Sequence, residues 1–224
     1  DLLAEKRTKE YEVIPAFKDY QGFPAALCVS INEEVVHGIP SSRRLREGDI
    51  VGLDFGVIYE GYYGDAAVTV GVGSILPEHE RLLQVTRESL WKGIEQARAG
   101  RHLSAVSAAI QKYVEGAGFS VVQDFVGHGI GQSMHEEPQI PNFVSPLSRG
   151  YDPVLRPGMT LAIEPMVNTG GYEVKISKKD QWTVTTKDQS YSAHFEHTVL
   201  VTEEEPEILT RIQRSDDTEE VVSW

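Results

Sequence analysis

The chain has 224 residues, of which 40% are hydrophobic and 25% are charged, and this composition is ordinary for a protein with one sizeable core. Its net charge of −13 speaks against nucleic-acid binding as a main task, because phosphate backbones would be repelled. No apolar run is long enough to span a membrane, no signal peptide is visible, and the single cysteine, Cys28, excludes an internal disulfide and fits the reducing cytoplasm.

The first part of the chain predicts a short helix followed by strands. Residues 1–12 are typical of the end of a helix, and residues 25–40 contain a β-leaning apolar run that ends at a turn after Gly38. Residues 48–73 are predicted to form a β-hairpin with its turn at Glu60 and Gly61.

The second part predicts two helices and then more strands. Residues 77–100 have apolar residues at helical spacing, and residues 103–118 form a second amphipathic pattern that ends in glycines. Strands are expected within three later segments, 119–131, 158–167 and 193–202. We expect a single catalytic domain over residues 1–210 and a polar tail over residues 211–224.

An internal echo links the two parts. "LREGDIVGLD" ends on Asp54 and "LRPGMTLAIE" ends on Glu164, and each is followed later by an apolar strand pattern that begins with an acid, Asp65 or Glu196. Two halves related by an approximate twofold, each supplying a hairpin with an acid on both strands, would bring four carboxylates together. Chance similarity between two strands of a sheet remains the alternative.

These four acids lie within or beside apolar runs, where burial disfavours a charged carboxylate. Two divalent cations would balance four such charges. Oxygen ligands with one imidazole suit Mn²⁺, Fe²⁺, Co²⁺ or Zn²⁺, and paired metals ionise water and stabilise a tetrahedral intermediate. The alternative is four acids at strand edges that face solvent.

The stretch "VGHGIGQSMHEEP" supplies two histidines. The glycines beside His128 allow close backbone approach and leave its ring unobstructed, so we assign His128 as the nitrogen ligand. His135 does not fit the spacing of a helical zinc motif and is better placed to donate a hydrogen bond to substrate. A phosphate-binding loop is a weaker interpretation, because the glycines alternate and no Lys-Ser/Thr pair follows.

Three other histidines are placed by their context. His37 ends a β-leaning run at a turn, where functional groups often project. His194 precedes Glu196 by two residues and shares its strand face, so it could approach the metals or bind a ligand, whereas His197 points to the opposite face.

Together with the motifs "HGIP", "GDIV", "GHGIG", "MHEEPQI", "GMTLAIEPM" and "EHTVLVT", these residues resemble the type I methionine aminopeptidases over residues 14–210. The resemblance implies an α/β (α+β) pita-bread fold, in which two pseudo-symmetric halves form a central curved antiparallel sheet covered by helices. It also implies two divalent ions, Co, Mn, Fe or Zn. The implied activity is removal of the initiator methionine before a small second residue, through a metal-activated hydroxide. We expect a cytoplasmic monomer that works near the ribosome, without binding nucleic acid or membranes.

The resemblance also implies roles for individual residues. Asp54 and Glu196 match bridging or bidentate carboxylates, Asp65 matches a ligand to one metal, and His128 and Glu164 match ligands to the other. Glu164 further matches the general base, and His37 and His135 match the two histidines that face the substrate. The remaining matches line the pocket for the methionine side chain: Tyr20, Phe23, Cys28, Met134 and Trp182.

The sequence departs from the family pattern in four places. We expect it to be incomplete at the N-terminus; Met134 stands where Phe is common, Phe17 where Cys is common, and His194 where Gln is common. Three alternatives stay open: an X-Pro dipeptidase on the same fold, a non-catalytic protein that has lost its metals, and a nucleotide-binding role for "GHGIGQ".

Overall fold

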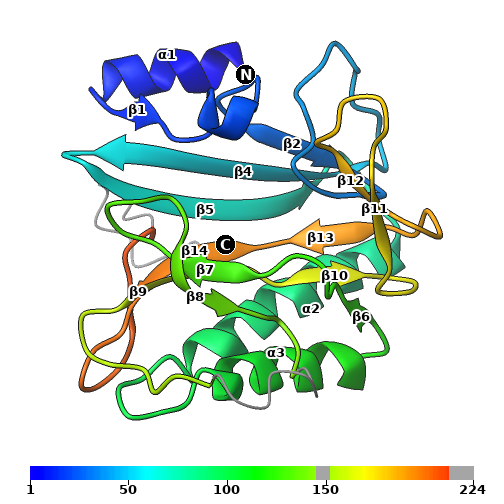
Figure 1. Ribbon diagram of the computed structural model, residues 1–224. Helices are drawn as coiled ribbons and strands as arrows, with labels where there is room; N and C mark the ends of the chain where they lie inside the picture. Colours follow the sequence, from blue (N-terminus) through cyan, green and yellow to red (C-terminus); the bar gives the residue numbers. More distant parts are fainter. Residues whose placement is uncertain (145–151, 212–224) are drawn as a thin grey trace, which may run out of the picture.

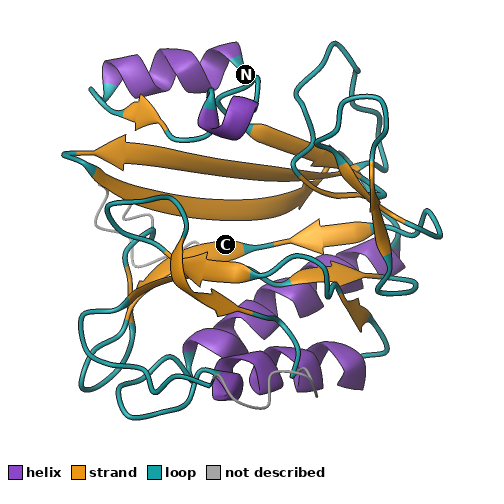
Figure 2. Cartoon of the chain, in the orientation of Figure 1, coloured by secondary structure: helices purple, strands orange, loops and turns teal. Residues whose placement is uncertain are grey.

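The computed structural model describes residues 1–144 and 152–211, so almost all of the expected tail lies outside the described residues. The helices of the described chain are α1 (Leu2–Glu10), α2 (Pro77–Ile94) and α3 (Ser104–Gly116), and Figure 2 shows α2 and α3 together on one side of the strands. Among the described residues, no helix has both the length and the apolar character needed to cross a membrane.

The predicted hairpin is confirmed. It consists of β4 (Ile50–Tyr59) and β5 (Tyr62–Gly71), which pair antiparallel along their whole lengths. Glu60 and Gly61 both have positive φ angles, 49° and 85°, as the tight hairpin turn of type I′ requires. Two shorter strands, β1 (Ile14–Pro15) and β2 (Cys28–Ile31), pair with β4 on its other edge.

The hairpin belongs to a nine-stranded sheet in which every described pairing is antiparallel. The strand order is β1-β4-β5-β14-β9-β7-β8, with β2 on β4 and β15 on β14. Its strands from the second half are β7 (Gly127–Gly129), β8 (Glu136–Ile140), β9 (Thr160–Ile163), β14 (Glu196–Leu200) and β15 (Glu207–Ile208). Segments from opposite halves of the chain therefore meet where β5 pairs with β14 (Figure 1).

Two three-stranded sheets flank the large one. The first contains β13 (Ser192–His194), β10 (Met166–Asn168) and β6 (Ser120–Val121), in that order. The second contains β11 (Val174–Ile176), β12 (Val184–Thr186) and β3 (Glu34–Val36). A single 3-10 turn, η1 (Tyr20–Gly22), follows β1.

The main core lies between the two long helices and the large sheet. Leu82 and Leu90 of α2 and Ile110 of α3 are buried in one apolar cluster with Leu161 and Val199 of the sheet. Burying each such side chain stabilises the fold by about 1.5–3 kcal/mol, although the conformational entropy of folding opposes this gain. The two helices therefore cover one face of the sheet, and a site can be built on the other face.

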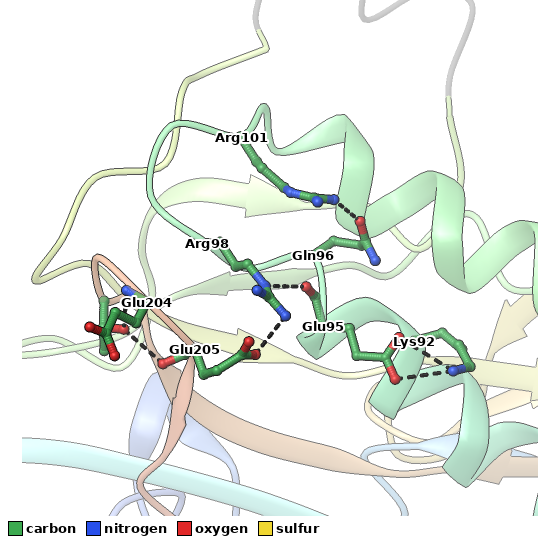
Figure 3. A network of polar contacts seen from close by, with 8 residues as sticks. Lys92, Glu95, Gln96, Arg98, Arg101, Glu204 and Glu205 are labelled. Atoms are coloured by element: carbon green, nitrogen blue, oxygen red, sulfur yellow. Dashed lines mark hydrogen bonds and ion pairs between the residues drawn. The ribbon is translucent and has the colours of Figure 1, made fainter.

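The helix predicted to start near Pro77 and to end just before Gly100 ends earlier than expected, at Ile94. Figure 3 shows the polar contacts that shape the chain beyond this point. The Arg98 side chain donates to the carbonyl of Glu95 at 3.0 Å and pairs with Glu205, while the Ala99 N–H donates to the carbonyl of Thr202. Exposed ion pairs contribute only about 0–1 kcal/mol, so these contacts define the turn more than they stabilise the fold.

Candidate metal centre

Four neighbouring strands of the large sheet each supply one candidate metal ligand, and the residue that follows a fifth strand, β9, supplies another. In the register of the sheet, Ala67 of β5 lies between Asp54 of β4 and Glu196 of β14, and His128 of β7 lies opposite Ala162 of β9. Residues two apart on a strand share a face. Asp65, two residues before Ala67, and Glu164, two residues after Ala162, therefore point to the same face as the other three. The side chains directed to this face are those of Asp54, Asp65, Glu196, Glu164 and His128.

The second pair of acids comes from neighbouring strands that are not a simple hairpin. Glu164 directly follows β9 and Glu196 begins β14, and these strands pair antiparallel, but β10 to β13 lie between them in sequence. Thr198 holds β14 against the first hairpin: its hydroxyl accepts from the Asp65 N–H at 3.0 Å and donates to the Asp65 carbonyl at 2.8 Å. The expected convergence of two acid-bearing strand pairs is therefore present, with a longer connection in the second.

The ligand atoms of these side chains lie close together. One ligand atom from each of Asp65, His128 and Glu196 lies within 4.8 Å of the other two. The same is true of one ligand atom from each of Glu164, His194 and Glu196. Because Glu196 belongs to both groups, it stands where a carboxylate could bridge two ions.

Burial and mutual repulsion make the metal-free cluster unfavourable. Burial raises the pKa of Asp65 to about 7, and burial followed by the neighbouring carboxylates raises the pKa values of Asp54, Glu164 and Glu196 well above their usual range. An oxygen of Asp54 and an oxygen of Glu196 are buried without any hydrogen-bond partner. Divalent cations would satisfy these oxygens and remove the repulsion, so the residues present fit a metal site.

His128 is held in the form that binds metals. Its Nδ1 lies 2.8 Å from the carbonyl of Gly129, which can only accept, so Nδ1 carries the proton and Nε2 keeps its lone pair. Burial lowers the pKa of His128 to about 4, which keeps the ring neutral at pH 7. Since Nε2 faces a carboxylate oxygen of Glu164 at 3.5 Å, two acceptors oppose each other where a cation would suit both.

The glycines beside His128 have the role expected of them. A Cβ at Gly127 would stand 2.3 Å from the carbonyl oxygen of Ala162, and one at Gly129 would stand 2.4 Å from that of Glu137. Only glycine therefore lets β7 lie this close to β8 and β9, and this approach places His128 against Glu164.

A cavity of about 160 Å³ opens onto the acid cluster. Engineered cavities of about 150 Å³ hold one benzene-sized molecule, so this space suits a single side chain. It is lined by all the residues assigned to the site from the sequence and by two more. These are Phe17, noted only as a departure from the family pattern, and Gln21, which no sequence pattern indicated. The assigned lining residues are Tyr20, Phe23, Cys28, His37, Met134, His135 and Trp182.

The two predicted substrate-facing histidines also line this cavity. The Nδ1 of His135 lies 2.7 Å from the hydroxyl of Tyr20, and the centroids of the His135 and His128 rings are 4.3 Å apart. His37 has a positive φ of 58° and lies edge-on to Phe125, and burial followed by the charge of His135 lowers its pKa to about 4. Both rings are therefore placed beside the acid cluster.

Comparison with known proteins places this arrangement in one family. The model of metallopeptidase family M24 matches residues 2–203. The methionine aminopeptidase of Clostridium acetobutylicum is 54% identical over 94% of this chain and 83% of its own length, and methionine aminopeptidase 1 of Bacillus subtilis is 52% identical over 95% and 84%. The chain belongs to metallopeptidase family M24, among the methionine aminopeptidases.

Solved structures confirm the fold expected for this methionine aminopeptidase family member. The crystal structure of methionine aminopeptidase from Thermotoga maritima matches with a TM-score of 0.88 and 51% identity, over 92% of this chain and 82% of that one. The prolidase from Pyrococcus horikoshii matches with a TM-score of 0.66 at 23% identity over 84% of this chain and 48% of that one, a likeness of fold alone. The protein is a metallo-exopeptidase with the pita-bread fold, and it uses metal.

His194 reaches the acid cluster of this aminopeptidase, as the sequence suggested it could. Its Nε2 lies 3.4 Å from a carboxylate oxygen of Glu164, and the residue is buried, with 3% of its surface exposed. Burial followed by the charge of His37 lowers the pKa of His194 to about 3. His197, by contrast, contacts Thr210 and Trp91 on the other side of the strand.

Proposed function

We propose that this enzyme removes the N-terminal methionine of polypeptides with two divalent ions, drawn from Co, Mn, Fe or Zn. The side chains that would hold the ions are those of Asp54, Asp65, His128, Glu164 and Glu196, and Glu196 belongs to both groups of possible ligand atoms. Such ions supply Lewis acidity, lower the pKa of water and offset the charge of the carboxylates.

The observation that carries the proposal is that the acid cluster forms one wall of a cavity that is otherwise mainly apolar. One wall consists of Asp54, Asp65, Glu164 and Glu196, and the others are mainly aromatic and sulfur-containing. A space for one side chain at the chemical groups suits removal of one terminal residue rather than cleavage inside a peptide.

The cavity walls suit the unbranched thioether of methionine. Phe23 and Trp182 meet edge to face with ring centroids 5.2 Å apart, and both pack in one cluster with Cys28 and Met134. Flexible sulfur-containing side chains bind well to aromatic rings, and an apolar pocket of this kind excludes water. The preference for a small second residue is part of the proposal and rests on the resemblance of the sequence motifs.

Two residues move or direct protons in the proposed reaction. Glu164 lies on the cavity beside the proposed ions, where its carboxylate can accept a proton from the attacking water and return it to the leaving amine. The proposed tautomer of His135 carries its proton on Nε2 and accepts a hydrogen bond at Nδ1 from the Tyr20 hydroxyl, 2.7 Å away, so that Nε2 can donate to the substrate carbonyl oxygen as negative charge develops. His37 lies on the same cavity and orients the terminal amide.

The test combines metal content with substrate choice. Elemental analysis of the active enzyme is expected to give two ions per chain, and Met-Ala-Ser is expected to be cleaved after Met while X-Pro dipeptides are not. Cleavage of X-Pro alone would replace this function with that of a dipeptidase. A protein that neither binds metal nor cleaves either substrate would be the non-catalytic alternative.

A single buried cysteine and the resemblance suggest a cytoplasmic monomer that acts on chains emerging from the ribosome. Sedimentation of the purified enzyme tests the monomer, because a sedimenting mass of twice 24.9 kDa would contradict it.

A further inference from the structure

Glu164 lies between two imidazoles, of which the proposed metal set uses one. The Nε2 of His128 faces one of its carboxylate oxygens at 3.5 Å, and the Nε2 of His194 faces the other at 3.4 Å. The two histidines come from β7 and β13, which belong to different sheets. The site thus contains a second nitrogen in a position equivalent to that of the first.

The Nε2 of His194 has no partner of its own. The atom is fully buried, it makes no hydrogen bond within the described chain, and the residue is 3% exposed. A buried polar atom without a partner costs about 1–3 kcal/mol, so such an atom calls for an explanation.

The backbone of His194 is held on both sides, which fixes the position of its Cβ beside the acid cluster. The Thr69 hydroxyl accepts from the His194 N–H at 2.9 Å and donates to the His194 carbonyl at 2.8 Å. On the other side, His194 is paired with Met166 of β10, two residues after Glu164. Thr69 and Met166 therefore hold the residue beside the acid cluster as firmly as Thr198 holds Asp65.

We propose that His194 is a second nitrogen ligand of the metal centre, and that it binds the same ion as Glu164. The inference rests on the proposed function. One ligand atom from each of His194, Glu164 and Glu196 lies within 4.8 Å of the other two, so a single cation can bind all three.

A direct hydrogen bond between His194 and Glu164 accounts less well for this geometry. The contact of 3.4 Å meets the distance of an ion pair, yet no hydrogen bond joins the two groups, and Nε2 is left without a partner. A cation between them satisfies both atoms without moving either backbone.

The ligand set then has two nitrogens, and this changes the metal preference. Imidazole binds Co²⁺ and Zn²⁺ better than it binds Mn²⁺, which prefers oxygen ligands. The enzyme is therefore expected to bind Co²⁺ and Zn²⁺ more tightly, relative to Mn²⁺, than a variant with an amide at position 194.

The experiment compares metal binding to the chelated full chain of the wild type, His194→Gln and His197→Gln. Calorimetric titration with Co²⁺ and with Mn²⁺ gives the number of ions and the Kd of each, and the visible absorption of bound Co²⁺ reports its ligands. We expect His194→Gln to weaken Co²⁺ binding about 10- to 100-fold, to weaken Mn²⁺ binding less, and to alter the Co²⁺ spectrum. His197→Gln removes an imidazole from the same segment that does not face the site, and should match the wild type.

A second measurement needs no variant, in case His194→Gln does not fold. Proton NMR of the Co²⁺-loaded wild type is expected to show paramagnetically shifted signals from two imidazole rings, and signals from only one ring would overturn the inference. Unchanged Co²⁺ affinity and spectrum in a folded His194→Gln would overturn it too, even if kcat fell. Failure of the proposed function is distinct, because a wild type that binds fewer than two ions contradicts the dinuclear site whatever the role of His194.

Discussion

Replacing Asp65 by Asn is expected to stabilise the metal-free protein at neutral pH, although it removes a proposed metal ligand. Asn keeps the oxygen that accepts from the Ala66 N–H at 3.0 Å, and the two hydrogen bonds between residue 65 and the Thr198 hydroxyl involve only the backbone of residue 65. The substitution therefore removes the charge, nearly keeps the shape and leaves these three hydrogen bonds in place.

The sign follows from the proton that the folded state retains. The pKa of Asp65 is about 7 when folded against 3.8 ordinarily, mainly because of burial, so stability falls as the pH rises through this window. The difference between the two pKa values corresponds to a loss of about 4 kcal/mol in the free energy of unfolding, at about 1.4 kcal/mol per pKa unit. The lowered pKa values of His37, His128 and His194 give the opposite dependence below about pH 6.5, but these residues are present in both proteins and cancel in the comparison.

Urea unfolding of both proteins with a chelator present, followed by circular dichroism from about pH 4 to about pH 7.5, measures this difference. Asp65→Asn should match the wild type near pH 4 and become several kcal/mol more stable near pH 7, whereas added Co²⁺ or Mn²⁺ should reverse the order. Asp188→Asn is the control: the pKa of its exposed carboxyl is lowered to about 2 by hydrogen bonds, first that of Ser190, so its effect should not vary in this range. A metal-free Asp65→Asn that is less stable than the wild type at pH 7, or a difference independent of pH, would refute the reasoning.

Three further substitutions test the site and its support. His135→Ala is expected to lower kcat about 10²-fold on Met-Ala-Ser, and an unchanged kcat would remove this residue from the carbonyl-binding role. Trp182→Ala opens the cavity wall and should raise KM for methionyl peptides more than it lowers kcat; steady-state kinetics with an unchanged KM would contradict this. Gly127→Ala places a Cβ 2.3 Å from the carbonyl oxygen of Ala162 and should cost about 1–3 kcal/mol in urea unfolding, whereas Gly64→Ala, which has open space, should stay within about 0.5 kcal/mol. Equal effects of the two glycine variants would show that this close approach is not what matters.

The sequence by itself determined the features that depend on near neighbours. The hairpin of β4 and β5 could be predicted because strand alternation and the Glu60-Gly61 turn are local, and the same alternation identified Asp54 and Asp65 as acids on a mainly apolar strand pair. The repeated pattern and the motifs around His128 identified the other candidates, and they lie where one site would need them. The end of α2 at Ile94 could not be predicted, because contacts with Thr202 and Glu205, far along the chain, shape the turn that follows it.

Only the tertiary structure decided which groups meet. The pairing of β5 with β14 brings Asp65 and Glu196 onto adjacent strands, and nothing local to either residue specifies that partner. The same holds for Gln21 at the cavity; for His194 the sequence indicated the strand face, while its position also depends on Thr69 of a distant strand. The physical reason is that side-chain alternation is set by the backbone of one strand, whereas the distance between ligands is set by hydrogen bonds between strands that fold together from opposite ends of the chain.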